Sequence, residues 1–149
     1  MLDDRYHLHR FVDAQEHDYV RALTEIRAGQ KRSHWIWYVF PQYDGLASSA
    51  TSKYYALKSL GEADAYLHHP VLGARLIECV EALCAQDDRS LAQIFGFPDD
   101  LKVRSCATLF ASVSAPGSVF ERLLAKYFAG EPDERTLRLI GAGRAAVSS

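Results

Sequence analysis

Apolar side chains recur along most of the chain with the spacing of amphipathic helices. The apolar positions after Asp13 repeat at intervals of four and three residues and stop before Gly29. Asp13 and Glu16 have the spacing of a capping box, and a glycine commonly follows the last turn of a helix. These signals predict a first helix over residues 13–28.

Serine caps and prolines divide the middle of the chain into further helices. Ser59 is placed to cap a short helix that stops before Pro70, because the residue before a proline disfavours helical geometry. Pro70 itself suits the first turn of the next helix. That helix has one apolar stripe, formed by Leu72, Leu76, Val80 and Leu83.

The second half of the chain has the same kind of signals. Caps predict three helices there, which begin after Ser90, Ser118 and Asp133. The first of these ends at Gly96, and residues 141–149 are predicted to form a frayed tail. We expect a mainly α fold, with seven or eight short helices in one compact domain over residues 1–149.

Residues 33–41 are the segment that also suits a β-strand, since they are rich in aromatic and β-branched side chains. No second segment of that composition is available to pair with them, and a lone strand leaves its backbone groups unsatisfied. We therefore favour a short buried helix, capped by Ser33 and ended by Pro41, over an extended segment.

Composition limits the classes of function. The chain has 149 residues, of which 48% are hydrophobic and 24% are charged, with a formal net charge of −2. This apolar content supports a folded core rather than a disordered chain. A slightly acidic chain whose only basic doublet is Lys31 and Arg32 does not favour nucleic-acid binding. No apolar run approaches the roughly 20 residues that span a bilayer, so we expect no membrane segment.

Three cysteines lie among apolar residues, at Cys79, Cys84 and Cys106. Their odd number argues against a disulfide framework, so we expect reduced thiols that pack as small apolar side chains in a cytoplasmic protein. Histidines near the N-terminus and beside Pro70 have no cysteine or carboxylate at ligand spacing. We therefore expect neither a metal site nor a cofactor.

Three segments contain polar side chains that suit a binding site, and the first is the aromatic segment. His34, Trp35 and Gln42 place polar groups against flat apolar faces, as a pocket that stacks a ring requires. The alternative is that Trp35 belongs to the core and that His34 bonds a nearby carbonyl.

The second segment is rich in small and hydroxyl side chains and leads into a helix near Lys53. Ser49, Ser52 and Lys53 together suit an anion such as phosphate, since free N–H groups at a helix start favour negative charge. The spacing is not that of a Walker loop. The alternative is that these hydroxyls only cap the helix and form turns.

The third segment is a helix whose apolar face must lie in the core. Arg104, Ser105, Thr108 and Ser112 lie on its opposite face. Asp100 and Lys102 stand at the start of the same helix and complete the candidate site. If that face lines a cleft, the guanidinium of Arg104 suits a carboxylate or a phosphate. If it faces solvent, Asp100 and Arg104 form an ordinary surface pair.

These segments together resemble the uncharacterised bacterial family called domain of unknown function 1810. The resemblance covers nearly the whole chain, and its most specific parts are residues 33–42, 65–76, 94–96 and 99–110. It implies a mainly α-helical single domain and brings no established activity or catalytic residues. The family has glycine where this chain has Ala47, which weakens the case for a ligand approached by bare backbone there.

Our leading hypothesis is a protein that binds a small anionic or nucleotide-like metabolite and could act on it as an enzyme. Three cations hold the anion in this hypothesis: Lys53, Lys102 and Arg104. Trp35 stacks on a ring, and His34 or Asp100 transfers a proton. The alternative is a helical module without catalysis that receives a partner peptide or a second copy of the chain.

Overall fold

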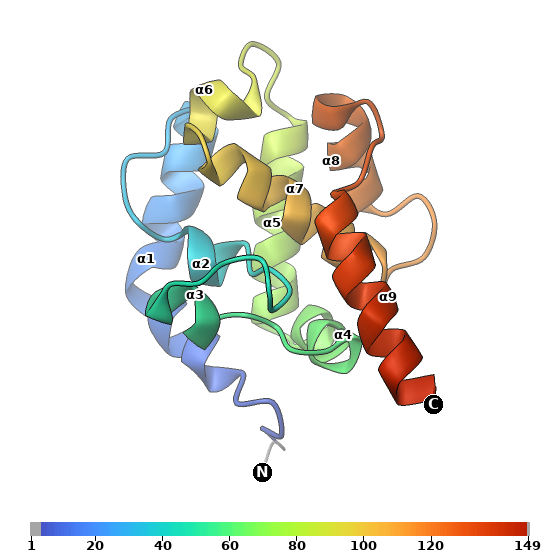
Figure 1. The fold of residues 1–149 in the computed structure, drawn as a ribbon. Helices are drawn as coiled ribbons and strands as arrows, with labels where there is room; N and C mark the ends of the chain where they lie inside the picture. Colours follow the sequence, from blue (N-terminus) through green and yellow to red (C-terminus); the bar gives the residue numbers. More distant parts are fainter. Residues whose placement is uncertain (1–3, 149) are drawn as a thin grey trace.

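A computed structural model describes residues 4–148, and the side chains of residues 4–141. Nine helices lie in that range (Figure 1): α1 (His9–Ala28), α2 (Ile36–Val39), α3 (Ala50–Tyr54), α4 (Leu60–His68), α5 (Leu72–Cys84), α6 (Leu91–Phe95), α7 (Asp99–Ala111), α8 (Val119–Phe128) and α9 (Glu134–Ser148). Within this range the chain has no strand, and one isolated bridge pairs Tyr43 with Leu57. The mainly α single domain is confirmed, with one or two more helices than expected.

Helix α7 lies at the centre of the fold. It packs against α4, α6, α8 and α9, and each residue from Ser105 to Phe110 is buried. The ring of Phe110 lies 5.4 Å from that of Tyr66 and 5.6 Å from that of Phe120. A helix enclosed on most sides has no wide polar face, so α7 orders the core through both its apolar and its small polar side chains.

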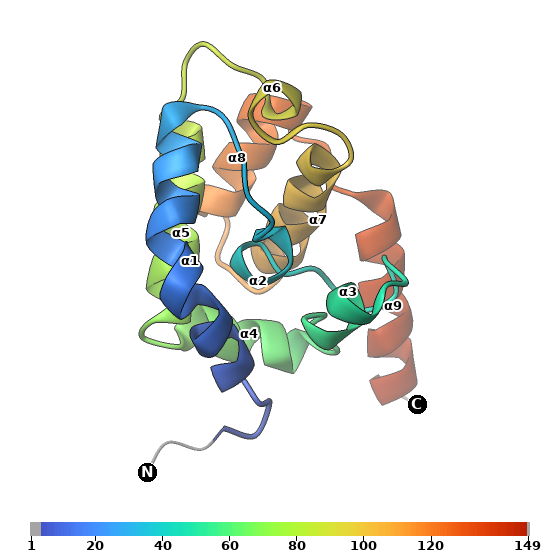
Figure 2. The same ribbon diagram turned by 90° about the vertical axis from the view of Figure 1, so that its left-hand side faces the viewer.

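Helices α1 and α5 lie side by side, and α4 crosses beneath them (Figure 2). The stripe predicted for α5 is confirmed, because Leu72, Leu76, Val80 and Leu83 are all at most 1% exposed. No helix in the described part of the chain has both the length and the apolar character needed to cross a bilayer.

The aromatic segment is helical, as favoured, but it forms only the single turn of α2. Its cap is not Ser33: Trp35 occupies that position and forms no side-chain cap bond. The hydroxyl of Ser33 instead donates to the carboxylate of Glu25 at 2.7 Å. The extended alternative is wrong, because side chains of α1 satisfy the polar groups before α2 and no partner strand is needed.

The serine caps are confirmed at three helix starts, where Ser59, Ser90 and Ser118 each accept a backbone N–H bond. The cap predicted at Asp13 is wrong. Helix α1 begins at His9, and the carboxylate of Asp4 accepts the N–H of Leu8 at 2.6 Å. Leu8 occupies the cap position without a side-chain cap bond, and Asp4 accepts the N–H groups of Leu8 and His9 from the preceding turn.

The predicted tail also differs from the structure. Helix α9 continues to Ser148, past Gly141 where we expected fraying to begin, and only Ser149 of the expected tail lies outside the described residues. Alanines are frequent after Gly141, and alanine has the highest helix propensity of any residue.

The corner between α4 and α5 is unusually close. The ring nitrogen Nδ1 of His69 accepts the N–H groups of Val71 and Leu72, at 3.1 and 3.2 Å. Gly73 lies so near the end of α4 that a Cβ there would be 1.9 Å from the carbonyl oxygen of Leu67. His69 and Gly73 therefore have structural roles in one of the segments that resembles the family.

Candidate functional site

Two lysines share one carboxylate where the loop after α1 meets the start of α7. The Nζ of Lys31 lies 3.0 Å from Oδ2 of Asp99, and the Nζ of Lys102 lies 3.1 Å from Oδ1. The side chain of Lys31 is only 8% exposed, whereas that of Lys102 is 24% exposed. One carboxylate between two ammonium groups leaves one positive charge uncompensated, and Lys102 is the cation that solvent reaches.

Each lysine also lies over a tryptophan ring. The Nζ of Lys31 is 5.2 Å from the ring centre of Trp35, and that of Lys102 is 5.3 Å from the ring centre of Trp37. Such contacts stabilise an ammonium by roughly 0.5–2 kcal/mol. We call these five residues, Lys31, Trp35, Trp37, Asp99 and Lys102, the lysine–tryptophan cluster.

The two rings differ in what they offer a ligand. Trp35 is fully buried among Phe40 and Phe95, so no face of its ring is open for stacking, as the core alternative required. Trp37 is only partly buried, and it borders a small hollow. The aromatic surface available at the cluster is therefore that of Trp37, two residues from the one we predicted.

Gln42 and Ser52 also line the hollow beside Trp37, together with Tyr43 and Tyr55. Its volume is about 10 Å³, which is close to the minimum for one water molecule. A ligand larger than water therefore contacts Trp37 and Lys102 from outside the hollow.

The other acidic residue at the start of α7 has an unsatisfied oxygen. Oδ1 of Asp100 is buried and has no hydrogen-bond partner among the described residues. A buried polar atom without a partner costs about 1–3 kcal/mol, and more when the group is charged. Such a cost is tolerated most often at a site where a ligand or water supplies the missing bond.

The rest of the predicted α7 face does not form part of this cluster. The Nε of Arg104 donates to the carbonyl of Glu131 at 3.1 Å, and its guanidinium lies 4.9 Å from the ring centre of Phe128. Ser105 donates to Leu101, and Thr108 accepts the N–H of Asp133 at 2.8 Å. The connection between α8 and α9 therefore packs against Arg104 and Thr108, and Thr108 also lines a cleft of about 380 Å³ with Pro132 and Leu137.

In the hydroxyl-rich segment the serine hydroxyls cap a helix, which is the alternative to an anion site. Ser49 caps α3, and its hydroxyl oxygen lies 2.7 Å from that of Ser52. Helix α3 has only five residues, too few for a strong terminal field, and Lys53 is exposed on it. His34 is exposed before α2 and is not among the residues that line the hollow.

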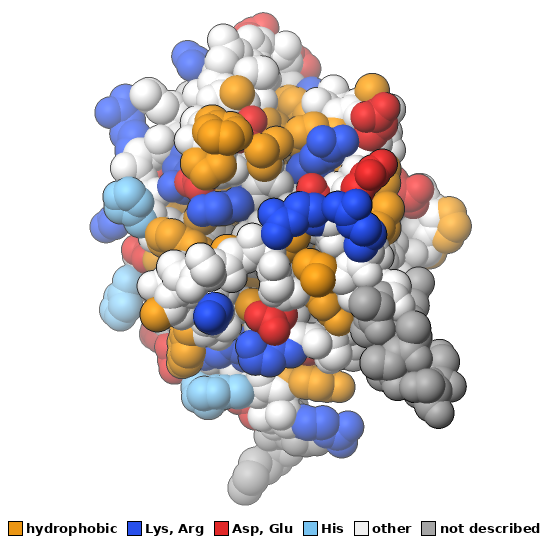
Figure 3. Space-filling model, viewed as in Figure 1, with side chains coloured by type: hydrophobic (Ala, Val, Ile, Leu, Met, Phe, Trp, Pro, Cys, Tyr) orange, Lys and Arg blue, Asp and Glu red, His pale blue; other side chains and the backbone are white. Residues whose placement is uncertain are grey.

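Basic and apolar side chains lie together on the face of the molecule that includes α7 and α9 (Figure 3). Apolar side chains are also exposed at the start of α7, where Phe97 is 81% and Leu101 is 42% exposed. This mixture is typical of a surface that binds another molecule.

A model of the family described as "Protein of unknown function (DUF1810)" matches residues 5–140. The chain belongs to the DUF1810 family. It is similar to the crystal structure of the conserved hypothetical protein Rv1873 from Mycobacterium tuberculosis, with 48% sequence identity and a TM-score of 0.91. The match covers 93% of this DUF1810 chain and 99% of the other chain. No curated protein matches the chain.

Glu25 fixes the loop between α1 and α2 that contains Lys31, and the sequence did not lead us to expect this role. In this DUF1810 protein its carboxylate accepts four bonds: from the N–H of Arg32, from the N–H and the hydroxyl of Ser33, and from Nε1 of Trp35. Burial would raise the pKa of this carboxyl, but the four donors outweigh it and lower the pKa to about 2. Glu25 therefore holds in place the loop that contains Lys31.

We expect the Glu25→Gln variant of this DUF1810 protein to be less stable by about 1–3 kcal/mol at neutral pH, because the amide accepts fewer and weaker bonds. A folded pKa of about 2 against an ordinary value of 4.5 means that the carboxylate stabilises the fold fully above about pH 4.5. The contribution is lost as the pH falls towards 2. Urea unfolding of wild type and variant from pH 7 to pH 2.5 should show the difference shrinking.

Glu16→Gln, at an exposed position of α1, is the matched control and should follow wild type at each pH. A constant difference between Glu25→Gln and wild type across this range would contradict the role given to the Glu25 carboxylate.

Proposed function

We propose that this DUF1810 protein binds a small anionic metabolite that contains a ring, such as a nucleotide-like compound, at the lysine–tryptophan cluster. The observation that carries this proposal is the ammonium of Lys102, which solvent reaches and which lies 5.3 Å from the ring centre of the partly buried Trp37. At the same end of α7, the buried Oδ1 of Asp100 lacks a donor, which a ligand hydroxyl or N–H group or a water supplies.

Each feature of the cluster has a counterpart in such a ligand. The ammonium of Lys102 attracts an anionic group, and the partly buried Trp37 offers an apolar ring surface. Asp100 does not belong to the cluster but lies in the same first turn of α7; in this proposal it accepts a ligand hydroxyl or ring N–H and transfers a proton if the ligand is also a substrate. Three free thiols, of which Cys79 and Cys106 are buried, fit a reducing cytoplasm.

A thermal-shift screen tests the proposal against nucleotides, NAD, ADP-ribose, sugar phosphates and small carboxylates. A ligand present at about 100 times its Kd stabilises the fold by about 2.7 kcal/mol, which raises the Tm by several degrees. Lys102→Met and Asp100→Asn should each lose the shift. Lys58→Met, at an exposed ion pair that does not belong to the cluster, is the matched control and should keep it. The proposal would be overturned if no ligand of the panel raised the Tm, or if both site variants kept the Tm shift.

Asp100→Asn offers an independent readout in the absence of ligand. Removing the charge of a buried carboxylate oxygen that has no donor should leave the free energy of unfolding unchanged or raise it. Chemical unfolding checks this. A marked loss of stability would show that Asp100 serves the fold and not a ligand.

The exposed side chains of Phe97 and Leu101 favour a second candidate, a surface that binds a partner peptide or a second copy of the chain. Light scattering after size-exclusion chromatography distinguishes a dimer of the chain from a monomer. A concentration-dependent dimer that becomes monomeric in Phe97→Ser would support binding of a second copy. A monomer at every concentration would exclude the second copy and leave a partner peptide as the ligand of this surface.

A further inference from the structure

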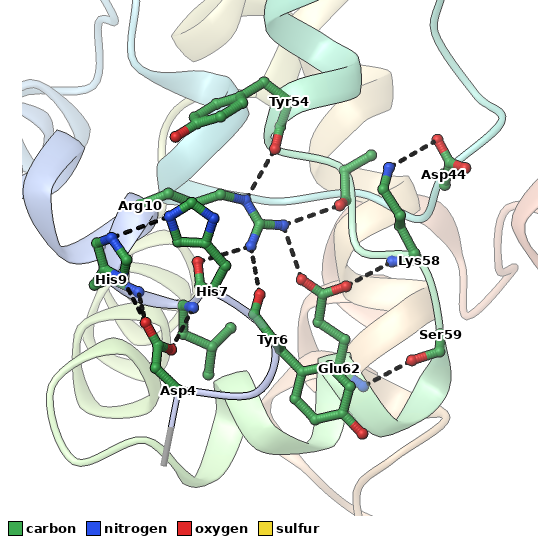
Figure 4. Close-up of polar contacts among 12 residues, drawn as sticks. Asp4, Tyr6, His7, His9, Arg10, Asp44, Tyr54, Lys58, Ser59 and Glu62 are labelled. Carbon is green, nitrogen blue, oxygen red and sulfur yellow. Dashed lines mark hydrogen bonds and ion pairs between the residues drawn. The ribbon is translucent and has the colours of Figure 1, made fainter. Parts of the chain in front are cut away.

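A second group of polar side chains lies at the start of α1 and in the turn before it (Figure 4). The carboxylate of Asp4 accepts the N–H groups of Leu8 and His9 and bonds the ring nitrogen Nδ1 of His9. On the other side of that ring, Nε2 of His9 lies 3.0 Å from Nε2 of His7. Two imidazole nitrogens therefore face each other, and a carboxylate orients one of the rings.

Arg10 fixes the backbone of this segment. Its NH1 group donates to the carbonyls of Tyr6 and His7 at 2.8 and 2.9 Å, and its Nε donates to the carbonyl of Tyr54. Its NH2 group bonds the carboxylate of Glu62 at 2.8 Å, and both side chains are 6% exposed (Figure 4). His7 is thereby held in the left-handed region, at φ 56°. The contacts of Arg10 therefore fix the backbone that carries the two rings.

The hydrogen bonds determine which nitrogens have lone pairs. A carboxylate oxygen accepts in its bond with Nδ1 of His9, so we assign the proton of His9 to Nδ1. Nε2 of His9 then has a lone pair directed at His7. This carboxylate–histidine arrangement is the one that orients most metal-bound imidazoles in proteins.

We propose that His7 and His9 together bind a divalent transition-metal ion, for which Zn²⁺ is the probe, through their two Nε2 atoms. Zinc–nitrogen bonds of about 2.0–2.1 Å at a tetrahedral angle place the two nitrogens about 3.3 Å apart, a few tenths of an ångström more than the observed 3.0 Å. Small ring rotations supply that difference. The proton that the rings share moves to Nδ1 of His7 when the ion takes its place.

The remaining coordination positions belong to water or to a ligand. Among the described side chains no group of three His, Cys, Asp or Glu residues is arranged to hold a metal ion, so the site has two protein ligands. His9 also lines a cleft of about 500 Å³, with Arg5, His68 and His69 among its other walls. The cleft leaves room for the waters or the anionic group that complete the coordination of the ion.

The test uses the full chain without a histidine tag, stripped of metal and titrated with Zn²⁺ by calorimetry and with Co²⁺ by visible absorption. We expect one equivalent of each ion to bind to wild type. His7→Asn and His9→Ala should each weaken binding at least about 10-fold, and asparagine suits the left-handed backbone at position 7. Asp4→Asn should weaken it about 10- to 100-fold, since the asparagine oxygen still accepts the N–H of Leu8 but the amide no longer holds the His9 tautomer.

Exposed histidines elsewhere on the surface provide the controls. His17→Ala and His34→Ala should bind the ions as wild type does, and so should Lys102→Met, which separates this site from the proposed metabolite site. Circular dichroism and the Tm identify any variant that has lost its fold, in which case His9→Gln replaces it. The proposal is overturned if wild type binds no ion, or if the affinity is unchanged in both His7→Asn and a folded His9 variant.

Discussion

Replacing Gly73 by alanine is expected to destabilise the protein by about 3 kcal/mol or more, which lowers the Tm by about 10 °C. The added Cβ would lie 1.9 Å from the carbonyl oxygen of Leu67 and 2.8 Å from its carbonyl carbon. Both are backbone atoms at the end of α4, so no side chain can rotate to relieve the clash. Thermal and urea unfolding of the purified variant measure the effect.

Gly141 provides the matched control, because it lies in α9 with nothing within 4 Å of an added Cβ. Gly141→Ala should be at least as stable as wild type, by up to about 1 kcal/mol, since alanine favours the helix. If Gly73→Ala melted within 2 °C of this control (roughly 0.5–1 kcal/mol), the corner between α4 and α5 would have to open without cost, contrary to its close packing.

Replacing Glu62 by alanine is expected to cost about 3–5 kcal/mol, the range seen when one partner of a buried ion pair is removed. The carboxylate accepts Arg10 at 2.8 Å and the N–H of Lys58 at 2.9 Å, and the side chains of the ion pair are each 6% exposed. Its loss leaves the guanidinium buried without a counter-charge. Urea unfolding at neutral pH gives the change in free energy directly.

The exposed ion pair nearby is the control for this substitution (Figure 4). Asp44 and Lys58 lie 3.9 Å apart with side chains 46% and 61% exposed, so Asp44→Ala should change stability by no more than about 0.5 kcal/mol. Equal effects at the two sites would mean that solvent reaches Arg10 and replaces the lost carboxylate.

Local signals in the sequence predicted much of the fold. A serine cap acts on an N–H three residues later, so Ser59, Ser90 and Ser118 could be identified from their immediate neighbours. The start of α1 was missed because Leu8 occupies its cap position without a side-chain cap bond, so no cap residue marks it in the sequence. The bonds from Leu8 and His9 to Asp4 come from the preceding turn, and nothing near Asp13 indicates them.

The candidate site was less accessible to sequence reasoning, since its contacts join distant segments. Lys31 belongs to a basic doublet that we weighed only as a nucleic-acid signal, and it lies in the loop after α1, whereas its partner Asp99 lies in α7. A helical wheel does place polar residues beside Arg104, as predicted. In the structure Glu131 packs against Arg104, and no pattern within α7 reveals that contact.

The position of Asp99 has a consequence for selectivity. Its carboxylate already contacts the ammonium of Lys102, so an incoming anion meets an intramolecular competitor rather than a bare charge. A ligand carboxylate that displaces Asp99 from Lys102 replaces one carboxylate contact with another, so it gains little binding free energy. A phosphate group, with up to two negative charges and three acceptor oxygens, gains more from the same exchange. The site should therefore rank ligands by charge density, with phosphorylated compounds ahead of simple carboxylates of the same size.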